Sequence, residues 1–414
     1  DLELKMKGYI ICTGTELLLG KTLNTNSQYI CDEFAKLGID VFKVVTVGDN
    51  LERIKAAIAE ADEDVDIVFL NGGLGPTEDD VTREALVSYL DIEETIDSKI
   101  KHRIEKQTSY QVLPGDLKVA MIPKGSKVFY SEAGVAPGTL IESKNKKYFL
   151  TPGPPNELKY LMEKELIPYI KKELLADEVI FSKTLKFAGI GESKAEDKIK
   201  DLIKSTNPTI APTIKEGEIH FRITAKGQKK EEAKRLVDEY SHEVLKRLDN
   251  YYFGRDEETI EGLVAQALDS KKLKVAVAES CTGGLLANTL TNIPGSSNFF
   301  DRGYITYSYE AKKEDLGVKE STLLQYGAVS ENTAIEMVEG VYAKTKADFT
   351  ISITGIAGPG GGTIDKPVGL VYMGFKYSDK VDVATRTFTG DRLMIKSKIV
   401  KFILFEMYKR LKEK

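Results

Sequence analysis

Histidine and cysteine are scarce in this chain of 414 residues, and their scarcity excludes several kinds of site. The only histidines are His102, His220 and His242. A Ser–His–Asp or Cys–His active site, or a histidine-rich metal site, therefore has almost no material. The three cysteines, Cys12, Cys31 and Cys281, are odd in number and widely spaced. They predict reduced thiols rather than a disulfide framework.

Long apolar runs and excess positive charge are also missing. No run approaches the roughly 20 apolar residues that a membrane helix needs, and the N-terminal residues do not resemble a secretory signal. We therefore expect a cytoplasmic protein with no membrane partner. The formal net charge of −5 makes the chain a poor general binder of nucleic acid. Residues 1–5, before Met6, are typical of an expression tag, and we expect them to play no part in the fold.

The length predicts two or three domains, and the pattern of elements favours three. Residues 6–170 alternate β-rich runs with amphipathic helices: strands at 8–14, 40–49 and 66–73, and helices at 25–38 and 50–62. Such βαβ alternation predicts a parallel sheet with helices on both faces. In such a sheet, ligands bind where the strands end and glycine-rich loops begin.

Residues 171–252 and 253–414 continue with a small α+β domain and a second α/β domain. The middle region is lysine-rich and runs strand, helix, strand, strand, helix, at 179–190, 193–204, 209–214, 217–226 and 230–248. Residues 249–259 are expected to be a linker. The last region has strands at 274–280, 302–308, 348–358, 368–377 and 382–390. Its closing helix is 391–412, with one apolar face made of Leu393, Ile399, Ile403, Leu404, Met407 and Leu411.

Ser280 is the candidate nucleophile of the last domain. It ends the strand KVAVAES and precedes Thr282, Gly283, Gly284 and a helix. A serine there can be aimed by rigid backbone, and the amides that start the helix can stabilise an oxyanion. No histidine lies in this domain, so another group must accept the serine proton. Lys312, with Tyr307 as relay, is the candidate base, provided that its pKa is lowered enough to keep it neutral.

Other roles are open for these residues. On spacing alone, Ser280 is more often a helix cap and Lys312 a solvated side chain. Cys281 is a rival nucleophile, but it lacks a histidine partner and needs no role beyond that of a small buried residue. Glu279 and Glu310 are rival bases. Glu279 should point to the opposite face from Ser280 because side chains alternate along a strand, and Glu310 should lie on a different side of a helix from Lys312.

Two loops and a helix start point to a phosphorylated substrate. GIAGPGGG, residues 355–362, which includes Gly355 and Gly358, can present consecutive N–H groups to an anion. GSSNFFDRG, residues 295–303, offers Ser296, Ser297 and Arg302. Arg392 begins the last helix, where the helix dipole also favours an anion. A glycine-rich loop alone is weak support, and a plain turn is an equal alternative.

These blocks together resemble the C-terminal domain of the CinA family, the nicotinamide-mononucleotide deamidases. The similarity covers about residues 256–412 and is carried by AESCTGGLLANTLTNIPGSS, RGYITYSYEAKKEDLGV, YGAVS, SITGIAGPGGG and KPVG. It implies hydrolysis of the carboxamide to nicotinate mononucleotide and ammonia. It also implies that Ser280 is the nucleophile, that Tyr307 and Lys312 activate it, and that Thr354 and Arg392 belong to the site. No cofactor is implied for this domain.

The first domain carries a second candidate site in NGGLGPTEDDVT. Gly72, Gly73 and Gly75 let a phosphate approach the backbone, and Thr77 and Thr82 flank the loop. Glu78, Asp79 and Asp80 cluster at a helix start, where carboxylates are often plain dipole partners. Asp79 and Asp80 are also hard ligands suited to a divalent cation that bridges phosphates. Two carboxylates that end neighbouring strands could complete the site, Glu16 and Asp49. The loops 134–138 and 151–158 are expected to be turns.

The first domain resembles the N-terminal CinA domain, which shares its fold with MogA/MoaB-type molybdopterin-binding domains. The similarity covers about residues 6–170, through GTELLLGKTLNTN, TVGDN, GGLGPTEDDVT and PGPPNE. It implies ADP-ribose pyrophosphatase activity that depends on a divalent metal ion (Mg, Mn or Co) and is helped by potassium. The middle region resembles the family's KH-like domain. A nucleic-acid-binding KH module needs a GXXG loop, and Gly189 and Gly191 have the wrong spacing. A spacer or a homodimer contact is therefore expected.

Three functions are compatible with the sequence. The first is a bifunctional hydrolase of nicotinamide mononucleotide and ADP-ribose. The second is an interaction protein, associated with competence or DNA damage, that only binds nucleotides. The third makes the first domain a pterin-handling transferase. The set Ser280, Tyr307 and Lys312 favours the hydrolase, because a pure binder does not need it.

Overall fold

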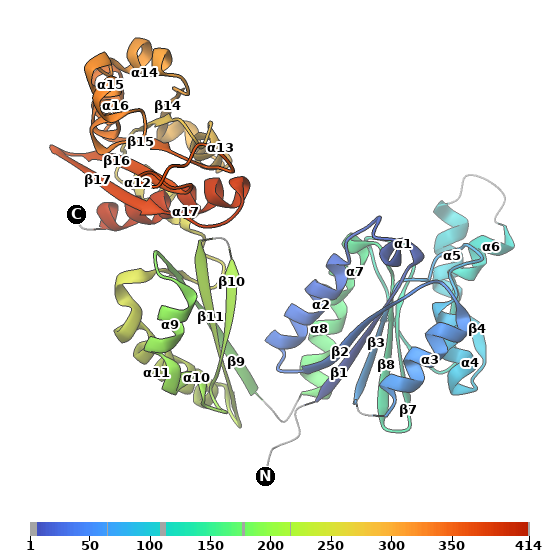
Figure 1. The fold of residues 1–414 in the computed structure, drawn as a ribbon. Coiled ribbons are helices and arrows are strands. Elements are labelled where there is room, and N and C mark those ends of the chain that lie inside the picture. Colours follow the sequence, from blue (N-terminus) through green and yellow to red (C-terminus); the bar gives the residue numbers. More distant parts are fainter. Residues whose placement is uncertain (1–5, 64, 108–112, 176–178, 216, 413–414) are drawn as a thin grey trace. The chain divides into compact units, whose positions relative to one another are not determined.

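The computed structural model describes residues 6–63, 65–107, 113–175, 179–215 and 217–412. They form two compact units, residues 1–180 with 226–233 and residues 181–225 with 234–414, each considered by itself (Figure 1). Residues 1–5 lie outside the described residues. The predicted order of α/β domain, small α+β domain and second α/β domain is confirmed. None of the helices in the described ranges is long and apolar enough to span a bilayer.

A six-stranded sheet forms the core of the first domain, in the order β2–β1–β3–β8–β7–β6. Its strands are β1 (Lys7–Thr13), β2 (Asp40–Val47), β3 (Ile67–Asn71), β6 (Lys127–Phe129), β7 (Gly138–Ser143) and β8 (Lys146–Thr151). The four strands β2, β1, β3 and β8 are parallel, as predicted, whereas β7 and β6 pair antiparallel and make the sheet mixed. The carboxyl ends of the four parallel strands therefore meet at one edge.

Helices cover both faces of this sheet, and apolar side chains alternate between the two. Phe34, Phe69 and Leu158 belong to the core on one face, and Ile54 and Leu70 to the core on the other. The helices are α1 (Thr15–Leu18), α2 (Thr25–Lys36), α3 (Leu51–Ala61), α4 (Thr82–Leu90), α5 (Ser98–Gln107), α6 (Pro114–Lys118), α7 (Pro155–Leu161) and α8 (Ile167–Tyr169), with π-helical turns at Met162–Leu166 and Ile170–Leu174. A short ribbon pairs β4 (Glu94–Ile96) with β5 (Met121–Pro123).

The middle domain has one strand more than the sequence predicts. Its sheet has the order β10–β11–β9–β12, from β9 (Val179–Ala188), β10 (Thr209–Lys215), β11 (Glu218–Gly227) and β12 (Tyr252–Arg255). The prediction that 249–259 is only a linker is wrong, because β12 pairs antiparallel with β9. The helices are α9 (Glu192–Lys198), α10 (Lys200–Ile203) and α11 (Lys230–Leu248). Phe253 of β12 is buried in the core of the last domain, so this strand also contributes a side chain to that core.

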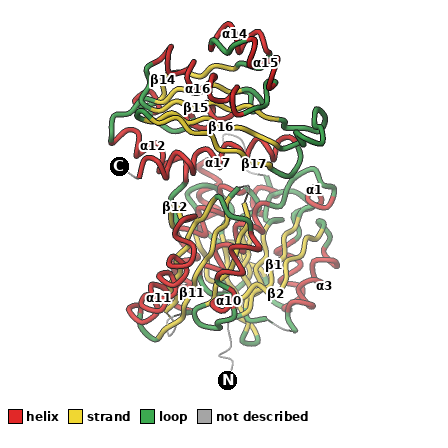
Figure 2. The backbone as a smooth tube through the Cα atoms, turned by 60° about the vertical axis from the view of Figure 1, so that its left-hand side comes forward, coloured by secondary structure: helices red, strands yellow, loops and turns green. Residues whose placement is uncertain are grey.

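The last domain is a three-layer α/β structure. Its sheet has the order β14–β13–β15–β16–β17, from β13 (Val275–Glu279), β14 (Phe300–Ile305), β15 (Phe349–Gly355), β16 (Leu370–Tyr377) and β17 (Lys380–Thr387). The strands β14, β13 and β15 are parallel, β16 pairs antiparallel with β15, and β17 pairs antiparallel with β16. Figure 2 shows helices on both sides of the sheet. They are α12 (Ile260–Ser270), α13 (Leu285–Thr291), α14 (Tyr309–Leu316), α15 (Glu320–Tyr326), α16 (Glu331–Thr345) and α17 (Arg392–Lys412).

The apolar face predicted for the closing helix α17 is largely confirmed. Ile399, Ile403, Met407 and Leu411 are buried in the core against the sheet. Leu393 is not part of this core, and its side chain is 75% exposed. The core therefore anchors α17 from Ile395 onward. The first two residues of the helix, Arg392 and Leu393, remain at the surface.

Candidate active sites

Ser280 begins the turn between β13 and α13 in the last domain. Its N–H donates to the carbonyl oxygen of Ile353, the last residue of β15 paired with β13, at 3.0 Å. The turn then passes through Gly283 and Gly284, whose φ angles of 60° and 94° are left-handed. Residues with a side chain avoid that region, so the two glycines allow the sharp bend. The bend holds Ser280 at the carboxyl edge of the sheet, as the sequence predicts.

Lys312 of α14 meets Ser280 in the interior. Its Nζ lies 3.1 Å from Ser280 Oγ, 2.7 Å from the carbonyl oxygen of Thr306 and 3.2 Å from that of Tyr307. The lysine side chain is fully buried and forms no ion pair within the described part of the chain. Burial penalises the charged ammonium and lowers the pKa of Lys312 to about 8. Lys312 is therefore a buried amine in contact with a serine hydroxyl, not a solvated surface residue.

Glu279 is occupied elsewhere, although it precedes Ser280. Its fully buried carboxylate accepts hydrogen bonds from the N–H groups of Gly284, Leu286 and Ala287, at 2.8–3.1 Å. These are the donors that the start of α13 leaves without helical partners, so Glu279 caps this helix. Glu310, the other rival base, is exposed on α14. Neither carboxylate is hydrogen-bonded to Ser280.

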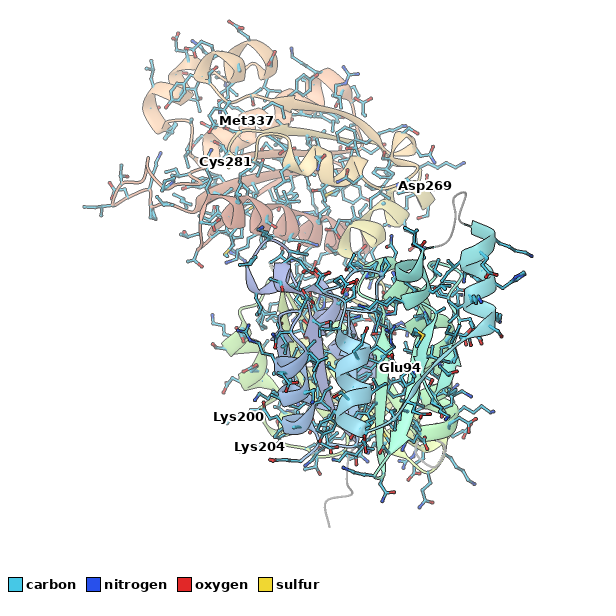
Figure 3. The ribbon with its side chains drawn as sticks, turned by 90° about the vertical axis from the view of Figure 1, so that its right-hand side faces the viewer. Glu94, Lys200, Lys204, Asp269, Cys281 and Met337 are labelled. Atoms are coloured by element: carbon cyan, nitrogen blue, oxygen red, sulfur yellow. The ribbon has the colours of Figure 1, made fainter. Side chains whose placement is uncertain are left out.

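Cys281 is a free cysteine that is buried inside the last domain (Figure 3). Burial raises its pKa to about 11, so it is not a thiolate at neutral pH. The main-chain N–H groups of Cys281 and Thr282 donate to no other described residue. They are the turn's available donors for an oxyanion, since Gly283 N–H is bonded to Ser280 O and Gly284 N–H to Glu279.

Two buried hydroxyl groups beside this pair have no partner. The Oγ1 atoms of Thr282 and Thr306 are buried and form no hydrogen bond in the described part of the chain. Thr282 belongs to the Ser280 turn, and Thr306 provides one of the carbonyl oxygens that hold Lys312. Burying a hydroxyl without a partner costs about 1–3 kcal/mol. A water molecule or a polar ligand that supplies a partner would remove this cost.

Tyr307 and Arg392 contact each other at the surface. Arg392 donates through Nη2 to the Tyr307 hydroxyl at 3.0 Å and through Nη1 to the carbonyl oxygen of Gly358 at 2.6 Å. The Tyr307 side chain is 60% exposed, and only its main-chain carbonyl contacts Lys312. Thr354 is buried next to Ile353 and donates to the carbonyl oxygen of Ala328 at 2.6 Å. The structure thus ties Arg392 to the loop that holds Gly355 and Gly358.

Ser296 is not brought to this cluster. It precedes β14, whose first residue pairs with the first residue of β13. Ser296 therefore lies at the amino edge of the parallel strands, opposite the edge where Ser280 stands. Sequence reasoning missed Lys396, whose Nζ would lie 3.8 Å from a Cβ at Gly283. The sequence could have indicated Lys396, because it follows Arg392 by four residues and so lies on the same face of the predicted helix.

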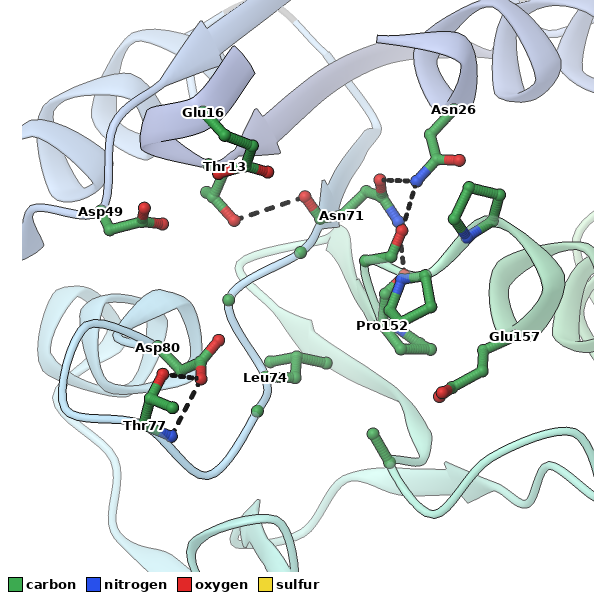
Figure 4. Close-up of a pocket in the computed structure, with 18 of the residues that line it drawn as sticks. Thr13, Glu16, Asn26, Asp49, Asn71, Leu74, Thr77, Asp80, Pro152 and Glu157 are labelled. Atoms are coloured by element: carbon green, nitrogen blue, oxygen red, sulfur yellow. Dashed lines mark hydrogen bonds between the residues drawn. The ribbon is translucent and has the colours of Figure 1, made fainter. Parts of the chain in front are cut away.

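The first domain contains a cavity of about 770 Å³ at the carboxyl edge of its parallel strands (Figure 4). The loops after β1, β2, β3 and β8 all line it. Every predicted site residue of this domain except Thr82 is among the lining residues, namely Glu16, Asp49, Gly72, Gly73, Gly75, Thr77, Asp79 and Asp80. Thr82 lies behind the wall, where its Oγ1 is 2.8 Å from Thr13 Oγ1. The loops 134–138 and 151–158, expected to be simple turns, also line the cavity.

The glycines after β3 let the backbone fold tightly against β1 and α4. A Cβ at Gly72 would lie 2.6 Å from the carbonyl oxygen of Thr13, and one at Gly73 would lie 2.1 Å from Thr82 Oγ1. No larger residue fits without displacing its neighbours. Their φ angles of 102° and 66° are also left-handed. The loop therefore presents bare backbone to the cavity, the feature that the sequence predicts for a phosphate site.

Two carboxylates of the cavity, Asp79 and Asp80, are brought together by Thr77. Among the described residues, no group of three or more His, Cys, Asp or Glu is arranged to hold a metal ion. Thr77 Oγ1 lies 2.5 Å from Asp79 Oδ1 and from Asp80 Oδ2 and can donate its one hydrogen to either, and Thr77 N–H donates to Asp80 Oδ2 at 3.0 Å. The hydrogen bond from Thr77 lowers the pKa of Asp79, which keeps that side chain anionic. Two carboxylates with substrate phosphates are a usual donor set for Mg²⁺.

Polar residues that sequence reasoning missed lie across the cavity from those carboxylates. Asn26 Nδ2 donates to Asn71 Oδ1 at 2.9 Å and to the carbonyl oxygen of Gly153 at 2.7 Å. Asn71 in turn donates to the carbonyl oxygen of Pro152 at 2.7 Å. These bonds fasten the proline-rich loop to β3. Glu157 also lines the cavity. The position of Glu157 after β8 could have pointed to this cavity, because β8 is the fourth parallel strand that ends at this edge of the sheet.

Comparison with known proteins gives matches along nearly the whole chain. Residues 9–172 match the probable molybdopterin binding domain family, residues 182–254 the damage-inducible protein CinA KH domain, and residues 257–411 the CinA C-terminal domain. A competence-damage inducible protein of Caldicellulosiruptor bescii is 46% identical over 98% of this chain and 99% of its own. One from Moorella thermoacetica is 42% identical over 98% and 99%.

The chain belongs to the CinA family. A solved structure within that family, the competence/damage inducible protein CihA from Agrobacterium tumefaciens, is 42% identical and covers 37% of this chain and 95% of its own, with a TM-score of 0.35. The identity with curated CinA relatives spans all three domains, so both candidate sites belong to one CinA chain. The presence of these domains is consistent with an enzyme.

The cap made by Glu279 can be separated from catalysis by substitution. Glu279→Ala should lower the free energy of unfolding of the last domain by about 3 kcal/mol, since it leaves three N–H donors without an acceptor. Glu279→Gln keeps one acceptor oxygen and should cost about half as much. Urea unfolding measures both values. A Glu279→Gln protein with unchanged stability and complete loss of activity would instead make Glu279 the base.

Proposed function

We propose that this CinA protein is a bifunctional pyridine-nucleotide hydrolase. Its last domain would deamidate nicotinamide mononucleotide to nicotinate mononucleotide and ammonia. Its first domain would cleave ADP-ribose to AMP and ribose 5-phosphate. The observation that carries the first activity is the buried Lys312 amine, 3.1 Å from Ser280 Oγ and without a carboxylate partner.

The hydrogen bonds of Lys312 suit a neutral amine acting as base. A neutral amine has two N–H groups and one lone pair. The carbonyl oxygens of Thr306 and Tyr307 can accept the two N–H groups. The lone pair is then left for the Ser280 hydroxyl, which donates its proton to Nζ as Oγ attacks the carboxamide carbon.

The remaining steps balance with the same two residues and one water. The N–H groups of Cys281 and Thr282 stabilise the oxyanion of the tetrahedral intermediate. The Lys312 ammonium returns its proton to the leaving nitrogen, and ammonia departs. The C–N bond is broken, and an ester to Ser280 remains. Water then attacks the ester with Lys312 again as base, which releases nicotinate mononucleotide and restores the serine.

Positive charge beside the turn can hold the substrate phosphate. Arg392 and Lys396 are one turn apart at the start of α17, where the helix dipole adds to their charge. Arg392 is held by Gly358 and by the Tyr307 hydroxyl. Tyr307 is therefore proposed to orient Arg392 through its phenol and Lys312 through its carbonyl, a positioning role in place of a proton relay.

The proposed activity of the first domain rests on its cavity. Bare backbone at Gly72, Gly73 and Gly75 can approach a pyrophosphate. Asp79 and Asp80 would hold a divalent cation, Mg, Mn or Co, together with the substrate phosphates, and potassium is the further ion expected. That cation would neutralise charge on the pyrophosphate when bound. Glu16 and Asp49 line the same end of the cavity and can position the attacking water.

Ser280→Ala should remove deamidation and leave the fold intact. Loss of the nucleophile should lower kcat for ammonia release from nicotinamide mononucleotide by about 10³-fold or more. Ser270→Ala, on the exposed end of α12, is the control and should keep kcat within about twofold. The assignment of the nucleophile fails if Ser280→Ala keeps more than about a tenth of the wild-type turnover with an unchanged melting temperature.

Asp80→Asn should impair ADP-ribose cleavage alone. The amide can still accept from Thr77 N–H, so the loop keeps its shape while the cation loses a charged ligand. We expect kcat/KM for ADP-ribose to fall about tenfold or more, and a chelator to abolish the wild-type activity. Release of ammonia from nicotinamide mononucleotide serves as the internal control and should be unchanged. Insensitivity of ADP-ribose cleavage to chelator would rule out the cation.

A further inference from the structure

Glu157 is a carboxylate of the first domain's cavity that the proposed chemistry does not use. It follows β8 in the proline-rich loop and lines the cavity. Within the described part of the chain, its carboxylate forms no hydrogen bond and no ion pair. Burial raises the pKa of Glu157, and the positive charge of Arg103 acts in the opposite direction. A half-buried carboxylate that faces a cavity needs hydrogen-bond donors, and either water or a bound ligand can supply them.

The backbone around Glu157 is shaped to receive its carboxylate. A Cβ at Gly134 would lie 2.1 Å from Glu157 Cδ and 2.2 Å from Oε2. The carboxylate thus rests directly against the loop 134–138, which has no side chain at the point of contact. Arg103 donates to the carbonyl oxygens of Ser131 and Glu132, which fastens α5 to the segment before that loop. Glu157 is therefore held in place by the wall of the cavity.

The position of Glu157 is remote from the phosphate end of the cavity. The acidic residues Asp49 and Glu16 follow β2 and β1, whereas Glu157 follows β8. The strand order β2–β1–β3–β8 places β2 and β8 three steps apart, roughly 14 Å at about 4.8 Å a step. In Figure 4, Leu74 and Pro152 lie between Asp80 and Glu157. That span is comparable to the length of an extended nucleoside diphosphate.

The surface between the two ends suits a flat heterocycle. The cavity includes apolar lining residues, namely Leu74, Ile104, Val119, Val135, Ala136 and Pro152, and Leu74 and Pro152 lie between the two ends in Figure 4. Apolar walls can cover the faces of a ring, but they cannot distinguish one base from another. Specificity at such a site comes from a few polar groups at the ring's edge. The free oxygens of Glu157 are acceptors, so they select a ring edge that carries N–H donors.

We propose that Glu157 is the specificity residue of this cavity and that it accepts a hydrogen bond from the exocyclic amino group of the substrate's nucleobase. The proposal rests on the proposed nucleotide chemistry of the first domain and adds the class of base to it. Adenine, with its 6-amino group, is the ring that ADP-ribose brings. Guanine carries its amino group at another position, and hypoxanthine carries none.

The test is calorimetric binding of ADP, IDP and GDP to the full chain in the presence of Mg²⁺. IDP is the matched probe, because a 6-oxo acceptor replaces the 6-amino donor of ADP, although IDP carries an N–H at the adjacent N1. Wild type should bind ADP about tenfold or more tightly than IDP, the ratio expected for one hydrogen bond to a charged acceptor. Glu157→Leu should reduce that ratio to within about twofold. Glu157→Gln keeps one acceptor oxygen and should give an intermediate ratio.

Two further variants separate the base end from the phosphate end. Gly134→Ala should displace the Glu157 carboxylate and reduce the ADP-to-IDP ratio as Glu157→Leu does, although Glu157 itself is unchanged. Asp80→Asn should weaken ADP and IDP equally and leave their ratio unchanged. Melting temperatures establish that each variant is folded, and the wild-type ratio tests the proposal without any variant.

The outcomes distinguish this inference from the function on which it rests. Equal wild-type affinities for ADP, IDP and GDP would overturn the role of Glu157 and leave nucleotide binding standing. Tighter binding of GDP than of ADP, lost in Glu157→Leu, would support the amino-group contact and count against adenine nucleotides as the substrate. Failure of all three to bind at millimolar concentration would overturn both the inference and the proposed cleavage of ADP-ribose.

Discussion

The contact between Lys312 and Ser280 depends on burying an amine without an opposite charge. An ammonium in that position loses its hydration and gains no carboxylate. Three oxygen atoms surround its nitrogen, and two of them are main-chain carbonyl oxygens that cannot give up a proton. Burial therefore lowers the pKa of Lys312 to about 8, which makes the neutral amine accessible at a pH where an exposed lysine stays charged. The surrounding features, from the Gly283–Gly284 bend to the capped start of α13, bring Ser280 to this amine.

Both α/β domains use the same geometric rule for different chemistry. In each, loops at the carboxyl ends of parallel strands converge at one edge of a sheet. In the last domain, the turn after β13 carries Ser280 and the segment after β14 leads to Lys312. In the first domain, four strand ends surround one cavity, with acidic groups toward β1 and β2 and Glu157 beyond β8.

Much of the fold and of the Ser280 site could be predicted from the sequence, because both depend largely on local sequence patterns. The strand before Ser280, the glycines after it and the absence of histidine pointed to a lysine base, and the Lys312–Ser280 contact is present in the structure. What sequence could not supply depends on long-range packing. The phenol of Tyr307 turns to Arg392 instead of the serine, Ser296 lies at the far edge of the sheet, and the proline-rich loop 151–158 joins a cavity whose other walls come from distant segments. The strand β12 was missed because its partner β9 is more than sixty residues away.

The dependence of deamidation on pH tests the central claim most directly. If neutral Lys312 is the base, kcat/KM for ammonia release should rise with pH through an apparent pKa of about 8 and fall about tenfold per pH unit below it. Lys312→Arg keeps the charge but cannot deprotonate, so it should lose about 10³-fold. Lys313→Arg, on the neighbouring position of α14, should behave as wild type. A flat profile between pH 6 and 9, as a rough working range, together with substantial turnover by Lys312→Arg, would contradict the account.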